Sequence, residues 1–154
     1  MLRVILSEIE GLEIFTVVVK KSIKKPLVKA LGSRKRATAR VWLYKGKGNI
    51  LVNDQKVEVY FPGKLSEVGL KEPFILTKTE GKFHATVKVA GGGPAGQLGA
   101  VVHGLSCALA KVQEKKYRLI LKKAGLLTRD SREKERRKPG RAGKARAKRQ
   151  SPKR

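Results

Sequence analysis

The side chains of this sequence with the most obvious chemistry gather in its last sixteen residues, 139–154. None of the sixteen is acidic, and none is apolar beyond alanine and proline. Fixing one residue costs about 1 to 2 kcal/mol of backbone entropy, which a segment this poor in apolar surface does not recover by folding on itself. We therefore expect an extended, disordered arm that becomes ordered on a polyanion, where its cations displace counterions from phosphates. The cations are Arg141, Lys144, Arg146, Lys148, Arg149, Lys153 and Arg154.

A glycine-rich stretch at residues 91–96 is a second candidate for phosphate contact. Gly91, Gly93 and Gly96 match the spacing of the dinucleotide-binding fingerprint, between an expected strand and an expected helix. A nucleotide-binding enzyme is therefore the alternative hypothesis. Against it, no second strand-helix-strand unit follows, and Gln97 stands where a Walker A loop needs lysine. The glycines either let backbone N–H groups approach an RNA phosphate or serve only a tight turn, and the sequence leaves both open.

The residue types needed for catalysis or metal binding are scarce. His84 and His103 are the two histidines, they fall on different expected elements, and no cysteine pair accompanies them. Cys107 is the single cysteine, so no intramolecular disulfide can form. We expect no catalytic centre, no metal and no cofactor, and a polar or RNA contact for His103.

The charge balance identifies the class of partner. Thirty-seven Lys and Arg against twelve Asp and Glu give a net charge of +25, which favours a nucleic acid. A membrane surface is disfavoured because the basic tail has no bulky apolar anchors. The apolar run at residues 14–19 is too short to span a bilayer, and acidic residues before it argue against a secretory signal or a mitochondrial presequence.

Between the arm and the N-terminus, hydrophobic periodicity predicts a sheet covered by helices on one face. Alternating or β-branched composition predicts strands at residues 37–44, 50–52, 74–77 and 83–89, the second returning after a glycine turn at 45–49. Apolar residues at helical spacing predict helices at 65–70, 98–112 and 114–124, with Pro73 stopping the first and Gly125 capping the last. Residues 57–61 are an apolar segment that ends at Pro62.

Three segments divide the chain. Residues 1–31 are an N-terminal extension of unknown role, whose β-branched run favours a hairpin within residues 1–19. Residues 32–128 form a globular domain, and residues 129–154 form an extended basic tail, in which acidic residues stop before position 139. Near the start of the domain, Arg34, Lys35 and Arg36 are consecutive cations, for which phosphate contact is favoured over a merely solvated strand edge.

Several motifs, in order, resemble one known family. Gly32-Ser-Arg-Lys-Arg-Ala-Thr-Ala-Arg-Val resembles its opening basic strand, and Val87-Lys-Val-Ala-Gly-Gly-Gly with His103-Gly104 resembles its central signature. Leu121-Lys-Lys-Ala-Gly-Leu-Leu-Thr-Arg-Asp-Ser-Arg and the final Lys153-Arg154 complete the match over residues 32–154. The sequence is similar to the bacterial-type small-subunit ribosomal protein nine family.

This resemblance implies an α+β domain, a mostly antiparallel sheet with helices packed on one face, carrying an extended basic C-terminal arm. It implies a structural role in the head of the small ribosomal subunit, with small-subunit rRNA, P-site tRNA and neighbouring head proteins as partners, and no membrane or small-molecule substrate. The expected location is a ribosome in the cytoplasm, although the sequence leaves an organellar ribosome open.

The same resemblance, with the charge pattern, assigns the contact residues. The resemblance implies that Lys153 and Arg154, at the tip, contact P-site tRNA, and an arginine fork suits this role since it can bind a phosphate with two hydrogen bonds. The residues expected to contact rRNA are Arg34, Lys35, Arg36, Arg40, Lys45, Lys47, Gly92, Gly93, Arg129, Arg132, Arg136, Arg137, Lys138, Arg141, Lys144, Arg146, Lys148 and Arg149.

Overall fold

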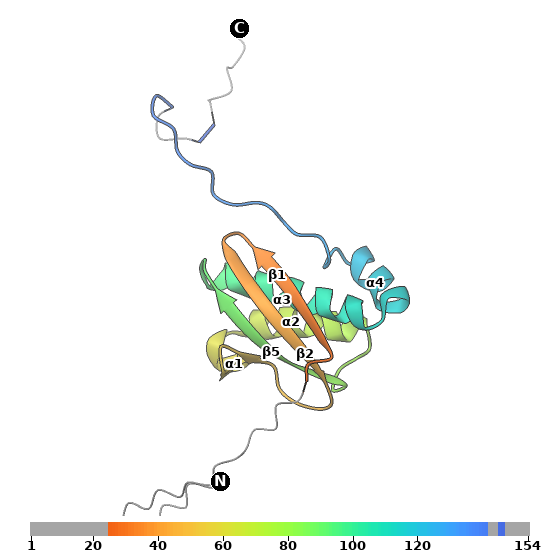
Figure 1. The fold of residues 1–154 in the computed structure, drawn as a ribbon. Coiled ribbons are helices and arrows are strands. Elements are labelled where there is room, and N and C mark those ends of the chain that lie inside the picture. The colour runs from red at the N-terminus through yellow and green to blue at the C-terminus, as the bar shows by residue number, and fades with distance from the viewer. Residues whose placement is uncertain (1–24, 142–144, 147–154) are drawn as a thin grey trace, which may run out of the picture.

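The computed structural model describes residues 25–141 and 145–146 (Figure 1). The hairpin predicted within residues 1–19 lies outside the described residues, and so do Lys144, Lys148, Arg149, Lys153 and Arg154. Within the described part of the chain, no helix is long and apolar enough to cross a lipid bilayer.

One five-stranded sheet forms the body, in the order β1-β2-β5-β3-β4. Its neighbours pair antiparallel except β3 and β5, which are parallel. The predicted strands at 37–44 and 83–89 are confirmed within a residue at either end. The strands are β1 Val28–Arg34, β2 Ala37–Lys45, β3 Leu51–Val52, β4 Gln55–Lys56 and β5 Phe83–Ala90.

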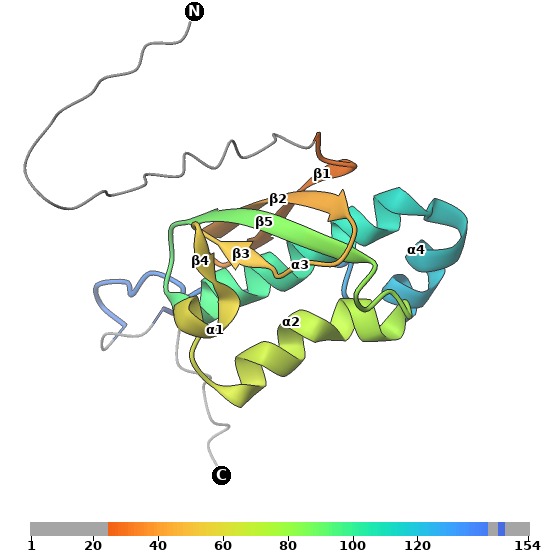
Figure 2. The same ribbon diagram turned by 90° about the horizontal axis from the view of Figure 1, so that it is seen from below.

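The long helices cover one face of this sheet (Figure 2). Odd-numbered residues of β2 and β5 point inward, so that Val41 and Val87 are buried against α3. The predicted helical stripe is confirmed, since Val101, Leu105 and Leu109 are fully buried. The expected α+β architecture is therefore correct. The helices are α1 Val57–Tyr60, α2 Lys64–Leu76, α3 Pro94–Val112 and α4 Glu114–Lys123, and Gly125 follows α4 with a positive φ of 75°.

Two predictions for the middle of the chain are wrong. The strand at 50–52 does not return along β2, because β5 occupies that edge over eight residue pairs and buries three side chains against the helices. β3 instead pairs with β5, placing Leu51 opposite Thr86. Residues 74–77 are not a strand, because α2 continues through Pro73 to Leu76. Burial of Leu70 and Phe74 on either side of the proline outweighs the cost of its missing hydrogen bond, about 3 kcal/mol.

The tightest packing lies between β1 and α3. A Cβ atom added to Gly32 would overlap the Ala100 carbonyl oxygen and would lie 2.6 Å from Cα of Gly104. A Cβ atom on Gly104 would in turn lie 2.7 Å from a methyl group of Val41. The two glycines therefore let a strand backbone touch a helix backbone, which fixes where α3 lies on the sheet.

This contact predicts that Gly32→Ala lowers the free energy of unfolding by about 3 kcal/mol or more, because backbone atoms on a rigid helix have to move. Gly69→Ala is the matched control: nothing lies within 4 Å of its added methyl group, in the interior of α2. Alanine should stabilise that helix by about 0.5 to 1 kcal/mol. Urea unfolding of the full-length variants measures both, and equal stabilities for the two variants would contradict the packing argument.

Candidate nucleic-acid interface

Three segments that are far apart in the sequence meet around one open groove. They are the β1–β2 turn, the glycine turn before α3 and the first residues of the arm. Seven cationic and two acidic side chains line it, a balance of +5. The lining residues are Arg34, Lys35, Arg36, Gly92, Gly93, Arg132, Glu133, Lys134, Glu135, Arg136 and Arg137.

The β1–β2 turn presents its cations at the end of the sheet. Arg34 pairs with Ala37, so only Lys35 and Arg36 make the turn, and Lys35 takes a positive φ of 51°. The side chain of Arg36 is 81% exposed, and its Nε lies 3.7 Å from a carboxylate oxygen of Glu133. An exposed pair at this distance holds little energy, so the Arg36 guanidinium remains available to a phosphate.

The glycine turn lies directly against the β1–β2 turn. Gly91 and Gly92 have positive φ values of 76° and 65°, and a Cβ on Gly91 would lie 2.6 Å from the Arg36 carbonyl oxygen. These two glycines therefore serve the turn and its close approach to the hairpin. Gly93, which precedes the first residue of α3, has open space at its Cβ position. The tight-turn interpretation is thus supported at Gly91 and Gly92, and phosphate contact by the glycine-rich stretch stays a prediction.

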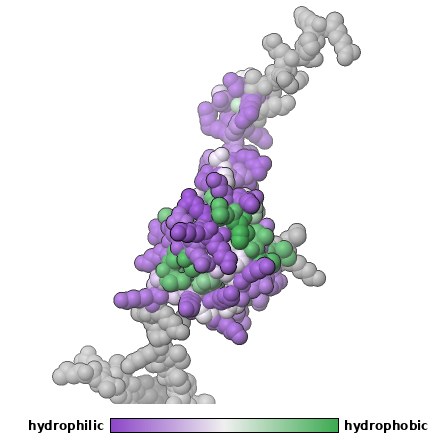
Figure 3. All heavy atoms as spheres, turned by 90° about the vertical axis from the view of Figure 1, so that its right-hand side faces the viewer, coloured by the Kyte–Doolittle hydropathy of each residue, from purple (hydrophilic) through white to green (hydrophobic). Residues whose placement is uncertain are grey.

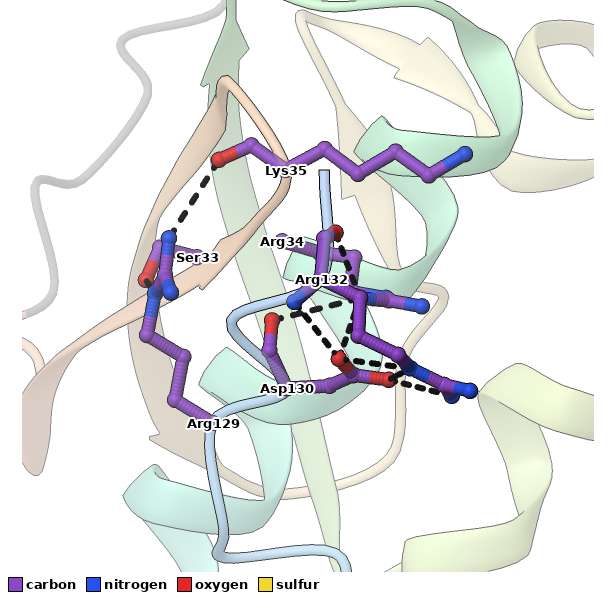
Figure 4. Close-up of polar contacts among 6 residues, drawn as sticks. All are labelled: Ser33, Arg34, Lys35, Arg129, Asp130 and Arg132. Carbon is purple, nitrogen blue, oxygen red and sulfur yellow. Dashed lines mark hydrogen bonds and ion pairs between the residues drawn. The ribbon is translucent and has the colours of Figure 1, made fainter. Parts of the chain in front are cut away.

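Arg34 joins the turn to the arm (Figure 4). Its Nη1 lies 2.9 Å from Oδ1 of Asp130 and donates to the carbonyl oxygens of Asp130 and Arg132, at 3.2 and 3.3 Å. Its aliphatic part lies over α3, where a Cβ on Gly99 would be 2.9 Å from Cγ of Arg34. With its side chain only 24% exposed, Arg34 is occupied in holding the arm.

Asp130 receives more hydrogen bonds from Arg132. The Arg132 guanidinium donates to Oδ2 of Asp130 from Nε at 2.9 Å and from Nη2 at 2.6 Å, and to Oδ1 from Nε at 3.1 Å. The Arg132 backbone N–H also donates to Oδ1, at 2.9 Å. These bonds favour the charged form, so they hold the pKa of Asp130 well below its usual range, and the positive charges of Arg132 and Arg34 add to the effect.

Arg129 and His103 complete the attachment of the arm. Arg129 donates from Nε to Oγ of Ser33 at 3.0 Å and from Nη2 to the Lys35 carbonyl oxygen at 3.3 Å (Figure 4). The Ser33 backbone N–H donates to Nδ1 of His103 at 3.2 Å, which leaves Nε2 of His103 to donate to the Leu127 carbonyl oxygen at 3.3 Å. The expected polar contact of His103 is confirmed, and it links β1, α3 and the start of the arm.

The arm runs without helix or strand over residues 129–138, along the groove and just past it. It then turns at Gly140, where φ is 74°, and Arg146 donates to both carboxylate oxygens of Glu135, at distances from 2.5 to 3.2 Å. Those bonds lower the pKa of Glu135. Hydrophilic side chains cover most of the face drawn in Figure 3 and continue along the described part of the arm.

The structure thus unites only part of the predicted contact set. Arg34, Lys35, Arg36, Gly92, Gly93, Arg132, Arg136 and Arg137 line the groove, and Arg129 braces it. Lys138, Arg141 and Arg146 lie farther along the arm. Arg40 is exposed on a face of β2 outside the groove. Lys45 and Lys47 lie at and just past the end of β2 that is farther from the β1–β2 turn and the groove. Sequence reasoning missed Lys134 and the role of the acidic residues at 130, 133 and 135, whose signal was their alternation with arginine and lysine.

The described residues favour neither metal binding nor thiol chemistry. Among the described residues, no group of three histidine, cysteine or acidic side chains is arranged to hold a metal ion. Burial raises the pKa of the half-buried Cys107 thiol, which makes its reactive thiolate form scarcer.

An α+β body that bears a cationic groove continuous with a basic arm has the construction of a nucleic-acid-binding protein. The family model for Ribosomal protein S9/S16 matches residues 32–154. The chain belongs to this family of ribosomal proteins, which are structural proteins and not enzymes. This excludes the alternative of a nucleotide-binding enzyme.

Curated relatives agree over most of the chain, and each of the following is named small ribosomal subunit protein uS9. The protein of Solidesulfovibrio magneticus is 54% identical over 73% of this chain and 85% of its own length. That of Maridesulfovibrio salexigens is 53% identical over 81% of this chain and 95% of its own. That of Rickettsia rickettsii strain Sheila Smith is 50% identical over 81% of this chain and 77% of its own length.

The arm attachment predicts a pH dependence. The lowered pKa of Asp130 means that its stabilising contribution is complete above the unfolded-state pKa, near 3.9, and is lost only as pH falls through the lower folded-state pKa. Arg132→Gln should therefore raise the Asp130 titration midpoint part of the way toward 3.9, as measured by NMR of the carboxyl carbon. Arg136→Gln removes the same charge farther along the arm and is the control. The same midpoint in wild type and Arg132→Gln would contradict the assignment.

Proposed function

We propose that this ribosomal protein is a structural component of the head of the small ribosomal subunit, like the relatives that carry that subunit in their name, and that its groove binds rRNA. The observation that carries the proposal is the +5 groove, assembled from three separate segments and continuous with the arm. Since the relatives named above are bacterial proteins, the ribosome is that of the cytoplasm.

The mechanism in the groove is electrostatic and positional. Arg36, Arg136 and Arg137 are exposed and present donors at its wall. Each guanidinium that meets a phosphate releases condensed counterions, and the planar fork fixes the orientation of the contact. Arg34 and Arg129 act differently, because their donors hold the arm against the turn and so aim the exposed cations.

The arm extends the contact away from the body. Its described part leaves the groove beyond the β1–β2 turn (Figure 1), and the family match continues to the last residue. We infer from the resemblance of the terminal Lys153-Arg154 that the tip contacts the anticodon stem-loop of P-site tRNA. The remaining arm cations, with Arg40, Lys45 and Lys47, contact rRNA, and neighbouring head proteins complete the set of partners.

The groove contact predicts a change in the salt dependence of binding. Removing two phosphate contacts with Arg36→Gln and Arg137→Gln should reduce the slope of log affinity against log salt by about 1.4 to 1.8, at 0.7 to 0.9 for each contact. The control, Lys78→Gln with Lys115→Gln, removes the same charge from exposed positions outside the groove. Filter binding to RNA comprising the head domain of small-subunit rRNA gives both slopes. Equal slopes for the two pairs would refute the groove as the contact surface.

The tip contact predicts that removing it weakens tRNA binding and leaves subunit assembly unchanged. Deleting Lys153 and Arg154 should weaken retention of P-site tRNA while small subunits still assemble, because the groove anchors the protein independently. Exchanging the pair, with Lys153→Arg and Arg154→Lys, keeps the charge and should keep the affinity. Purified ribosomes with each variant are tested by tRNA dissociation, and unchanged retention after the deletion would count against the contact.

A further inference from the structure

The face of the sheet opposite the helices is a second cationic surface, separate from the groove. Figure 1 looks onto this face, with α3 and α2 behind β1, β2 and β5, and Figure 2 shows the helices on the other side. The burial alternation places one set of side chains outward on the three long strands. They are Lys29, Leu31, Arg40, Trp42, Tyr44, His84, Thr86 and Lys88.

The charges on this face lack counter-charges from the strands themselves. The three long strands contain no aspartate or glutamate. Arg40 and Lys88 are direct partners in adjacent antiparallel strands, and both are exposed. Like charges directly opposite each other destabilise a sheet, and an anion bound between them would relieve the repulsion. The arrangement therefore favours a negatively charged ligand.

Aromatic rings lie beside those charges. Trp42 and Tyr44 follow Arg40 on the same face. Trp42 lies about 7 Å beyond Arg40 along the strand, and Tyr44 lies about 7 Å beyond Trp42. Tyr44 is stacked on its cross-strand partner His84, with ring centroids 5.2 Å apart and planes 15° from parallel. His84 is itself held, because Nδ1 lies 3.2 Å from the Gly46 carbonyl oxygen and Gly48 leaves no room for a Cβ beside its ring. The Tyr44–His84 pair is thus ordered before any ligand arrives.

We propose that this open sheet face binds a single-stranded segment of RNA. Bases stack on Trp42 and on the Tyr44–His84 pair, and a backbone phosphate lies between Arg40 and Lys88. Aromatic rings interleaved with cations are the usual platform for single-stranded nucleic acid, since every base offers a π face and every nucleotide a phosphate. The inference rests on the proposed function in taking rRNA as the source of the strand, but the surface and its chemistry are distinct from those of the groove.

The single tryptophan of the chain makes the site directly observable. Full-length protein is titrated with a single-stranded RNA of about 10 nucleotides, within the range of known site sizes, and with an abasic strand of equal length. We expect the strand with bases to quench Trp42 fluorescence and the abasic strand to leave it nearly unchanged. Equal quenching by both strands would overturn the stacking contact.

Variants separate this face from the groove. Arg40→Gln with Lys88→Gln should shift the quenching titration to higher RNA concentration, whereas Arg36→Gln with Arg137→Gln in the groove should leave its midpoint in place. Trp42→Leu should weaken binding of the base-containing strand roughly 5-fold or more, measured by anisotropy of labelled RNA, with Trp42→Phe in between and abasic binding unaffected. A quenching midpoint that follows only the groove variants would overturn the proposal.

A final measurement identifies the occupant in the assembled particle. Ultraviolet irradiation of small subunits that contain the full chain should leave a nucleotide adduct on the peptide bearing Trp42 and Tyr44. A crosslink to another protein, or a peptide that stays unmodified, would overturn RNA as the occupant. The groove is tested separately, by the slope of log affinity against log salt. A failure of the sheet contact alone would therefore not contradict the proposed function.

Discussion

The backbone contact between β1 and α3 is the constraint on which the rest of the structure depends. Gly32 and Gly104 let the strand and the helix touch without side chains between them. That contact sets the position of α3 along the sheet, which places the glycine turn before it against the β1–β2 turn and places Gly99 under Arg34. The groove exists because a packing contact in the core fixes these neighbours.

The carboxylates at the start of the arm form ion pairs with neighbouring arginines. Asp130 pairs with Arg34 and Arg132 and so attaches the beginning of the arm, which has little apolar surface to bury. Glu133 and Glu135 also pair with arginines, in more exposed contacts. Five other acidic residues lie between positions 54 and 80, around α1 and α2, and the three long strands have none. The negative charge is thus kept away from the open sheet face, where it would oppose a phosphate backbone.

Local patterns identified the elements whose own composition decides their conformation. The alternation in β2 and β5 and the apolar stripe of α3 succeed as predictors because each buries one face on the same core. The prediction fails where tertiary packing opposes a local rule. Pro73 lies inside α2 because the apolar residues around it are buried, and β3 joins β5 because the longer strand already holds the edge of β2.

The sequence by itself determined the chemistry of the protein: a net charge of +25, an arm with almost no apolar surface, three consecutive cations shortly after Gly32, and three consecutive glycines at positions 91–93. These follow from composition and spacing, which folding does not change. Only the tertiary structure decided which cations act together, since the turn lies more than fifty residues before the glycines, the glycines lie about forty residues before the arm, and the three meet through packing. It also divided the arginines into those that hold the arm and those free to bind, because a guanidinium already hydrogen-bonded to protein has fewer donors left for phosphate.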